Sequence, residues 1–279
     1  MLATEAMQKG SFARAVDLYS TAIADDQLPA ADRLVAHNNR AVAYRRLGLH
    51  RRAIDDYDAA LELAPTDGDL YYNRALALAR SGQLDRAIRD FDTALRVAPQ
   101  SDSQRGPEDG DILYNRGNAF QRKGLMENAI ADYTSAIALD PTNARSHFAR
   151  GQVYATLGKH DQALTDFERC IELDPQFAPA FSGRGFSLSG TGAHDRAVQS
   201  YSLAVDLQPN YAPAYRGRAD AFRRLGRYDQ AVTDYSRAIT LLRGTAEGYY
   251  GRGLAYRGLG DYDRAIADFS EAIRRAPDH

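Results

Sequence analysis

The sequence lacks several features that define common protein classes. It has a single cysteine, Cys170, among 279 residues, so no internal disulfide can form. No stretch approaches the roughly 18 consecutive apolar residues of a membrane-spanning helix. The N-terminus has no basic start followed by an apolar stretch, so no signal peptide is visible. We therefore expect a cytoplasmic protein, with the periplasm as the alternative if a signal peptide has been removed.

Net charge is also small. The formal charge is −2 and the isoelectric point is about 6.3, which gives no support to nucleic-acid binding. Lysine occurs at only three positions and arginine supplies the other 32 basic residues, a bias that favours a GC-rich, bacterial genome. With 44% hydrophobic and 26% charged residues, the chain shows no bias towards disorder.

A period of 34 residues organises what is present. The segments RGNAF, RGQVY, RGFSL, RADAF and RGLAY begin at residues 116, 150, 184, 218 and 252. Arg40 and Arg74 are also 34 residues apart, and an eight-residue insertion, 102–109, separates Arg74 from the next repeat. In each repeat a glycine is followed five residues later by alanine and nine residues later by Tyr or Phe. Apolar spacings of three and four on either side of a glycine predict two amphipathic helices joined by a tight turn.

This pattern resembles the tetratricopeptide repeat family in its small-residue positions, its aromatic residues and the proline that closes most repeats. Eight repeats are expected within one domain, 1–279, and we number them 1 to 8 in chain order: 1–29, 34–67, 68–101, 110–143, 144–177, 178–211, 212–245 and 246–279. The resemblance implies an all-α, right-handed α-solenoid. It also implies that the first helix of each repeat lines a concave groove and that the second helix forms the convex back.

Signals for enzymatic chemistry are scarce, and no catalytic residue is predicted. Ser, His and Asp recur with the repeat and do not converge as a triad. Histidine replaces a packing aromatic at five places, and no two of these share a helix face at ligand spacing, so we expect neither a metal nor a cofactor: His37, His50, His147, His160 and His194. Cys170 occupies an alanine position and is expected to be a buried, unreactive thiol.

The repeated arginine has a partner in the sequence. An aspartate follows it by 16 residues in six of seven repeats, and the pairs are Arg40 with Asp56, Arg74 with Asp90, Arg116 with Asp132, Arg150 with Asp166, Arg218 with Asp234 and Arg252 with Asp268. A constant offset predicts an ion pair within each helix pair, because arginine can donate two hydrogen bonds to one carboxylate. Contact of these arginines with a ligand is the alternative. The exception is Arg184, which is followed by Ser200.

Charge is divided unevenly between the two sets of helices. Seven first-helix windows contain 17 Arg or Lys and 4 Asp or Glu, so the rest of the chain is strongly acidic. We therefore predict a basic groove that attracts an acidic peptide or a C-terminal carboxylate; solvated surface charge is the alternative. The arginines expected to line this groove include Arg80, Arg122, Arg216 and Arg223.

Asparagine precedes the repeated arginine in three successive repeats, at Asn39, Asn73 and Asn115. The family resemblance implies that amides at this position hold the main chain of an extended peptide, for which an amide offers both a donor and an acceptor. Asparagine is also simply common at this position in the family. Four aromatic residues flank the asparagine line as candidate stacking surfaces: Tyr72, Tyr114, Phe148 and Tyr250.

Repeat 6 departs most from the pattern. Its first helix, FSGRGFSLSG, is rich in Ser and Gly, which lowers its helix propensity. Phe186 is predicted on the groove side. Together with the unpaired Arg184 it forms the most distinctive candidate site, as a hinge or a specificity pocket, although drift in one repeat is the alternative.

These features predict a non-enzymatic scaffold for protein interactions that binds an extended, possibly acidic, peptide segment of a partner protein in its groove. One alternative is a self-assembling structural protein, a homo-oligomer that associates through its ends or its convex face. Ile266 and Ile273 of the last repeat are expected to be partly exposed, because no polar capping helix follows that repeat in this sequence. The other alternative is a targeting or regulatory region of a larger enzyme.

Overall fold

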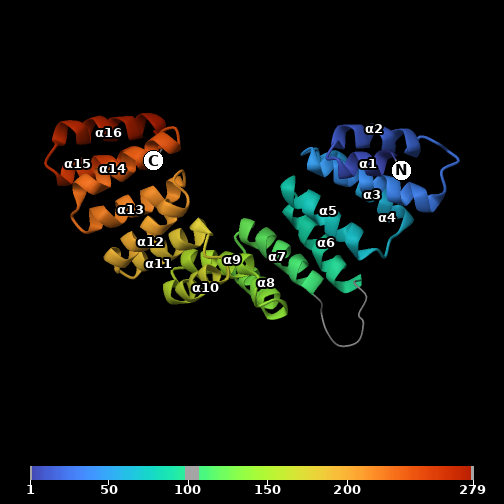
Figure 1. Cartoon of the computed structure of the whole chain (residues 1–279), viewed down its shortest axis with the longest axis horizontal. Helices are drawn as coiled ribbons and strands as arrows, with labels where there is room; N and C mark the ends of the chain where they lie inside the picture. The colour runs from blue at the N-terminus through green and yellow to red at the C-terminus, as the bar shows by residue number, and fades with distance from the viewer. Residues whose placement is uncertain (1, 98–106, 278–279) are drawn as a thin grey trace. The chain divides into compact units, whose positions relative to one another are not determined.

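The computed structural model describes residues 2–97 and 107–277, and these residues form sixteen α-helices and no strand (Figure 1). The helices follow one another as antiparallel pairs, one pair per predicted repeat: α1 (Leu2–Gln8) with α2 (Phe12–Ile23), α3 (Ala30–Arg46) with α4 (His50–Leu63), α5 (Gly68–Arg80) with α6 (Leu84–Val97), α7 (Pro107–Arg122) with α8 (Met126–Leu139), α9 (Ala144–Thr156) with α10 (His160–Leu173), α11 (Ala178–Gly190) with α12 (His194–Leu207), α13 (Ala212–Arg224) with α14 (Tyr228–Leu241), and α15 (Ala246–Gly258) with α16 (Tyr262–Arg275). The predicted all-α fold of helix-turn-helix repeats is confirmed.

Each pair turns on its glycine. At Gly124, between α7 and α8, φ is +78°, a conformation that costs a residue with a Cβ about 1–2 kcal/mol. The next backbone N–H, that of Leu125, donates to the carbonyl of Phe120 over 2.9 Å and so satisfies one of the free carbonyls at the end of α7. The punctuating glycine therefore has a structural reason in each repeat.

Contacts group the chain into two compact units, residues 1–141 and 142–279, which we call unit 1 and unit 2. Each unit contains four helix pairs and has its own core. The sequence-based prediction of one domain stays a prediction. Of the predicted insertion 102–109, residues 102–106 lie outside the described residues and 107–109 belong to the first turn of α7.

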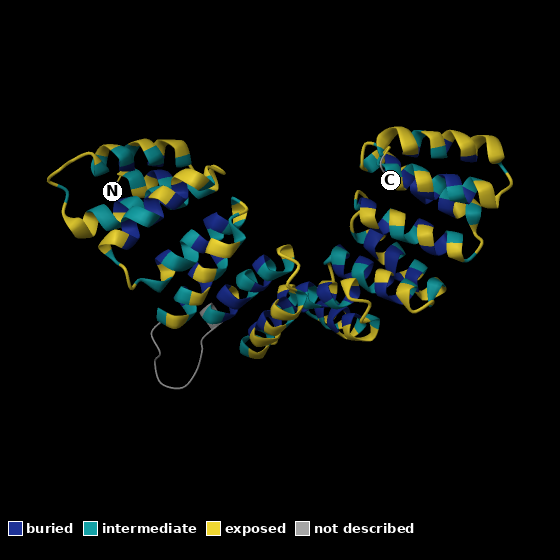
Figure 2. Ribbon diagram, turned by 180° about the vertical axis from the view of Figure 1, so that it is seen from behind, coloured by how far each residue is buried: buried dark blue, intermediate teal, exposed yellow. Residues whose placement is uncertain are grey.

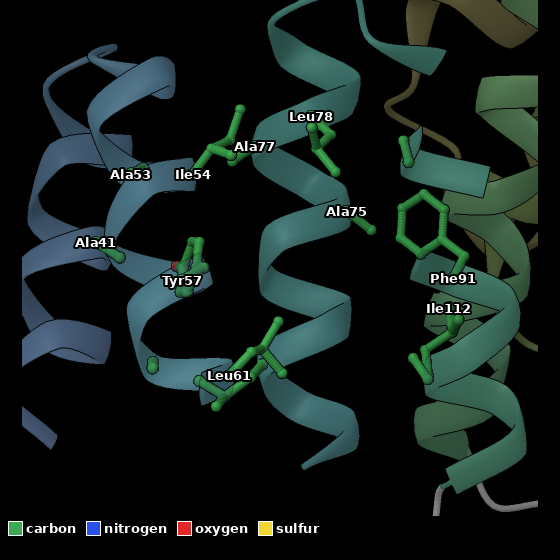
Figure 3. Close-up of a cluster of buried hydrophobic side chains, with 14 of the residues drawn as sticks. Ala41, Ala53, Ile54, Tyr57, Leu61, Ala75, Ala77, Leu78, Phe91 and Ile112 are labelled. Atoms are coloured by element: carbon green, nitrogen blue, oxygen red, sulfur yellow. The ribbon is translucent and has the colours of Figure 1, made fainter. Parts of the chain in front are cut away.

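In unit 1 the core forms where small residues let helices approach one another. Tyr57 of α4 and Phe91 of α6 are fully buried on either side of α5, which contributes Ala75 and Leu78 between them (Figure 3). Buried and exposed residues alternate along the helices, as expected for amphipathic elements packed on their neighbours (Figure 2).

Unit 2 repeats the same construction with Phe167, Tyr201 and Tyr235 as its large buried rings. Cys170 of α10 has no exposed surface, and burial raises the pKa of its thiol to about 11. The predicted buried thiol is therefore confirmed, and it is protonated near neutral pH. No helix among the described residues has the length and apolar composition needed to cross a membrane.

Candidate functional site

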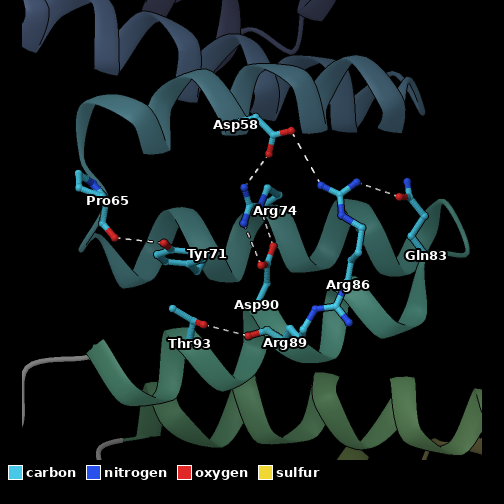
Figure 4. Close-up of polar contacts among 9 residues, drawn as sticks. All are labelled: Asp58, Pro65, Tyr71, Arg74, Gln83, Arg86, Arg89, Asp90 and Thr93. Carbon is cyan, nitrogen blue, oxygen red and sulfur yellow. Dashed lines mark hydrogen bonds and ion pairs between the residues drawn. The ribbon is translucent and has the colours of Figure 1, made fainter.

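The repeated arginine forms the predicted ion pair. Arg74 of α5 donates from Nε to Asp90 Oδ2 (2.7 Å) and from Nη2 to Asp90 Oδ1 (2.9 Å) (Figure 4). The same two-bond contact occurs in each of the other predicted pairs, those of Arg40, Arg116, Arg150, Arg218 and Arg252. All six aspartates are buried. These arginines are therefore part of the scaffold.

A third bond from the same arginine links neighbouring repeats. Arg74 Nη1 donates to Asp58 Oδ1 of α4 over 2.6 Å, so one guanidinium joins three helices (Figure 4). The equivalent acceptors are Ser20 for Arg40, Asp92 for Arg116, Ser202 for Arg218 and Ser236 for Arg252. This link was not predicted from the sequence, although the sequence contains a signal for it. All five acceptors occupy one position of the repeat, and each carries a side-chain oxygen that can accept a hydrogen bond.

Two histidines join these pairs. His37 Nδ1 lies 2.9 Å from Asp56 Oδ1, and His147 Nδ1 lies 3.3 Å from Asp166 Oδ1. Their interpretation as packing substitutes was therefore incomplete. Burial acts to raise the pKa of the Asp166 carboxyl, but hydrogen bonds from Arg150 and His147 outweigh it, and the pKa is lowered.

Arg184 differs from the other repeated arginines. Its Nε donates to the neutral Ser200 Oγ over 3.0 Å, and burial lowers the pKa of its guanidinium. Its guanidinium carbon lies 5.3 Å from the centre of the Phe181 ring. Arg184 is thus engaged with α12 and its own helix, and it does not line the pocket that contains Phe186.

The four candidate stacking residues share one contact. Each lies against an aromatic ring on the second helix of its own repeat, with ring centres 5.7–6.1 Å apart: Tyr72 with Phe91, Tyr114 with Tyr133, Phe148 with Phe167 and Tyr250 with Phe269. Repeats 6 and 7 have Ser182 and Arg216 at this position. Neither Tyr201 nor Tyr235 therefore has an aromatic ring packed against it from this position of the first helix of its own repeat.

A pocket of about 860 Å³ lies over these two rings in unit 2. It is formed mainly by the first helices α11, α13 and α15, and it brings together four of the predicted site residues: Phe186, Arg216, Arg223 and Tyr250. Tyr201 and Tyr235 also line it. Phe186 and Tyr250 are 54% and 56% exposed, so both rings remain accessible in the pocket.

Glycine forms part of this pocket where other repeats have asparagine. A Cβ added at Gly217 would lie 2.3 Å from Tyr201 Cζ, and one at Gly251 would lie 2.4 Å from Tyr235 Cε1. Both distances are far below van der Waals contact. At these two positions the ring of the preceding repeat therefore leaves no room for an asparagine side chain.

The charge of the pocket is mixed. Asp220 Oδ1 accepts a hydrogen bond from the Tyr235 hydroxyl (2.5 Å) and lies 3.8 Å from Arg223 Nη2. Arg216 and Arg224 are exposed and form no ion pair within the described part of the chain. Glu247 also lines the pocket. Three arginines therefore face two carboxylates, a smaller excess of positive charge than the first-helix composition suggested.

In unit 1, three of the predicted site residues connect α7 to α5: Asn115, Arg122 and Tyr72. Asn115 Nδ2 donates to the Tyr72 hydroxyl (3.1 Å) and to the Asp111 carbonyl (2.8 Å), and Arg122 Nη1 donates to the Ala79 carbonyl (2.6 Å). Three further predicted residues lie on first helices of this unit, where Arg80 is exposed and two asparagines are half-buried: Asn39 and Asn73. These residues share the first-helix side of unit 1.

The last helix exposes two apolar residues. Ile266 and Ile273 of α16 are 62% and 63% exposed, as predicted, whereas Ile54 and Leu61 at the same repeat positions are buried. Self-association through this face stays a prediction. Over residues 2–97 and 107–277, no three His, Cys, Asp or Glu side chains gather as a possible metal site.

Comparison with protein families agrees with the repeat register. Models described as tetratricopeptide repeat match residues 72–144 and, separately, 35–67, 144–177 and 246–279; a model described as TPR repeat matches 219–260. A search of curated proteins found no match to the chain.

Solved structures show the same fold. A tetratricopeptide repeat protein from Parabacteroides merdae is 22% identical over 87% of this chain and 93% of its own, with a TM-score of 0.69. YrrB, described as a TPR protein with an unusual peptide-binding site, is 24% identical over 72% of this chain and 97% of its own, with a TM-score of 0.56. MamA is 26% identical over 60% of this chain and 92% of its own, with a TM-score of 0.53. The chain belongs to the tetratricopeptide repeat family, whose members generally act as non-catalytic modules that bind protein or peptide partners.

Proposed function

We propose that the chain is a scaffold that binds an extended peptide segment of a partner protein along the first helices of its repeats. The pocket over α11, α13 and α15 carries this proposal, because it gathers Phe186, Arg216, Arg223 and Tyr250 on that side of unit 2. Its volume of about 860 Å³ lies within the usual range of ligand pockets. YrrB, a structural relative, is a TPR protein with an unusual peptide-binding site, which supports the proposal.

In unit 1 the line of asparagines would bind the main chain of the peptide. Asn39, Asn73 and Asn115 present carboxamides on successive first helices, and a carboxamide can pair with the main chain of any peptide sequence. Asn115 already uses Nδ2 towards Tyr72 and Asp111, so its Oδ1 would accept from a peptide N–H. Arg80 would add positive charge beside this line.

We assign no catalytic role to the repeated polar residues. The arginine and aspartate side chains bond to one another and to the preceding repeat, and the two histidines near them bond to the same carboxylates. These groups therefore stabilise the contacts between helices.

An acidic ligand is favoured by Arg216 and Arg224, which have no carboxylate partner among the described residues.

The proposal is tested with peptides selected on the full chain from a random linear library displayed on phage. The first-helix variant combines Asn73→Ala, Asn115→Ala and Arg216→Glu. We expect it to weaken the selected peptides by at least about tenfold, the equivalent of about 1.4 kcal/mol. Binding is measured by fluorescence anisotropy, and thermal unfolding shows that the variant is folded.

A matched variant places the same kinds of change on second helices. Asn128→Ala on α8 and Arg196→Glu on α12 replace exposed residues outside the pocket, so binding should stay within about twofold of the original. Loss of binding in this variant, with full binding retained by the first-helix variant, would overturn the proposal.

A further inference from the structure

We propose that the unit 2 pocket selects one class of segment: an extended peptide with two bulky apolar side chains about five or six residues apart and an acidic residue between them. This inference rests on the proposed function and makes it specific. Its basis is the order of the lining residues across three helices, with a ring on α11, a cation on α13 and a ring on α15.

The two outer helices supply the apolar sites. Phe186 of α11 is 54% exposed and its ring centre lies 6.1 Å from that of His160. Tyr250 of α15 is 56% exposed and rests on Phe269, with Leu254 lining the pocket on the same helix. Each ring contacts one other ring of the protein and remains more than half exposed. A bulky apolar side chain of a ligand would cover the exposed part of the ring and remove it from water.

The middle helix supplies the charge. Arg216 of α13 is exposed and has no ion pair within the described residues, whereas the nearby Asp220 already accepts the Tyr235 hydroxyl and lies near Arg223. The cation that remains available for a ligand is therefore Arg216, supported by Arg224 one turn beyond Asp220. A carboxylate of the ligand is the complementary group.

The spacing follows from the packing of helices. Packed helices lie about 8–10 Å apart, so the two steps from α11 to α13 and from α13 to α15 span about 16–20 Å. An extended chain advances about 3.3 Å per residue. The two apolar side chains should therefore be about five or six residues apart, with the acidic residue near the midpoint.

The site is open because the first helices of repeats 6 and 7 have no aromatic residue at the position that packs over the ring of their second helix. Ser182 and Arg216 stand where four other repeats place an aromatic residue over the ring of the second helix. Gly217 and Gly251 leave space for Tyr201 and Tyr235 beside the first helices. Repeats 6 and 7, which are adjacent, thus both lack the aromatic residue that four other repeats have at this position. The pocket lies over these two repeats.

To test this inference, peptides that bind the full chain are selected from the same phage-displayed library, with random peptides of 12 residues, and the selected peptides are sequenced. We expect enrichment of two aromatic or large aliphatic residues about five or six positions apart with Asp or Glu between them. Arg216→Glu should weaken such a peptide at least tenfold, and a peptide with lysine in place of its acidic residue should bind this variant better than the wild type. Phe186→Ala and Tyr250→Ala should each weaken binding at least threefold.

Arg196→Glu on α12 and Leu203→Ala, which removes a 44% exposed side chain from the same helix, are the matched controls. The inference is overturned if no peptides are selected, if they lack the motif, or if Arg216→Glu and the charge-exchanged peptide show no compensation. Peptides that depend only on Asn73 and Asn115 would contradict this inference and leave the proposed function standing. Peptides insensitive to every first-helix variant would contradict both.

Discussion

Asp166→Ala is expected to lower the free energy of unfolding by about 3–5 kcal/mol, because it leaves the partly buried Arg150 and the buried His147 without their acceptor. Asp166 is 2% exposed, and its two oxygens accept from Arg150 Nε (2.9 Å) and Nη2 (2.8 Å) and lie near His147. Urea unfolding followed by circular dichroism measures the loss. Glu172→Ala, which removes an exposed carboxylate from the same helix, should change stability by no more than about 0.5 kcal/mol.

The same carboxylate predicts a pH dependence. The pKa of Asp166 is lowered in the folded chain, so its stabilising contribution is present above the unfolded value of about 3.9 and is lost as the pH falls through the lowered pKa. The stability difference between the wild type and Asp166→Ala should therefore shrink below about pH 4. A difference that stays constant into strong acid would contradict the ion pair as its source.

Ser200→Asp is expected to raise the free energy of unfolding by about 1–2 kcal/mol, since hydrogen bonds to charged groups contribute about 1.5–3 kcal/mol before the cost of burying the new carboxylate. It would give Arg184 the acceptor that six other repeats possess, in place of one bond to a neutral hydroxyl. The Arg184 guanidinium is already partly buried, and that burial lowers its pKa. A carboxylate partner would therefore offset the free-energy cost of burying this charge.

Ser200→Asn is the control for this prediction, because it has nearly the same shape and carries no charge. It should leave stability within about 0.5 kcal/mol of the wild type. A loss of stability in Ser200→Asp equal to that in Ser200→Asn would show that Arg184 does not form the contact made by the other repeated arginines.

Much of the scaffold could be predicted because the repeat keeps each residue type in a constant position. The 16-residue offset between Arg116 and Asp132 places both on facing sides of one helix pair, and the structure has that bond. The link from Arg116 to Asp92 was missed because it runs between repeats and because its acceptor is Asp in some repeats and Ser in others. Contacts between repeats depend on how helix pairs stack, and the offset within one pair does not determine this.

The pocket shows a different limit. Phe186, Arg216 and Tyr250 were each expected on the first-helix side, but their convergence depends on missing side chains at Ser182, Gly217 and Gly251. A sequence shows which residues a repeat contains more readily than the space that small residues leave beside a neighbouring ring. Arg184 was grouped with Phe186 for its place in the sequence, whereas in the structure it bonds to Ser200 and lies outside the pocket lining.

The most direct test of the account is to locate a library-selected peptide by photocrosslinking. A photoreactive benzoylphenylalanine is placed in turn at Phe186 of α11, at Tyr250 of α15 and at Leu203 of α12, all exposed positions in unit 2. The account predicts crosslinks from the two first-helix positions and little or none from Leu203. Crosslinks from Leu203 with none from Phe186 or Tyr250 would contradict it.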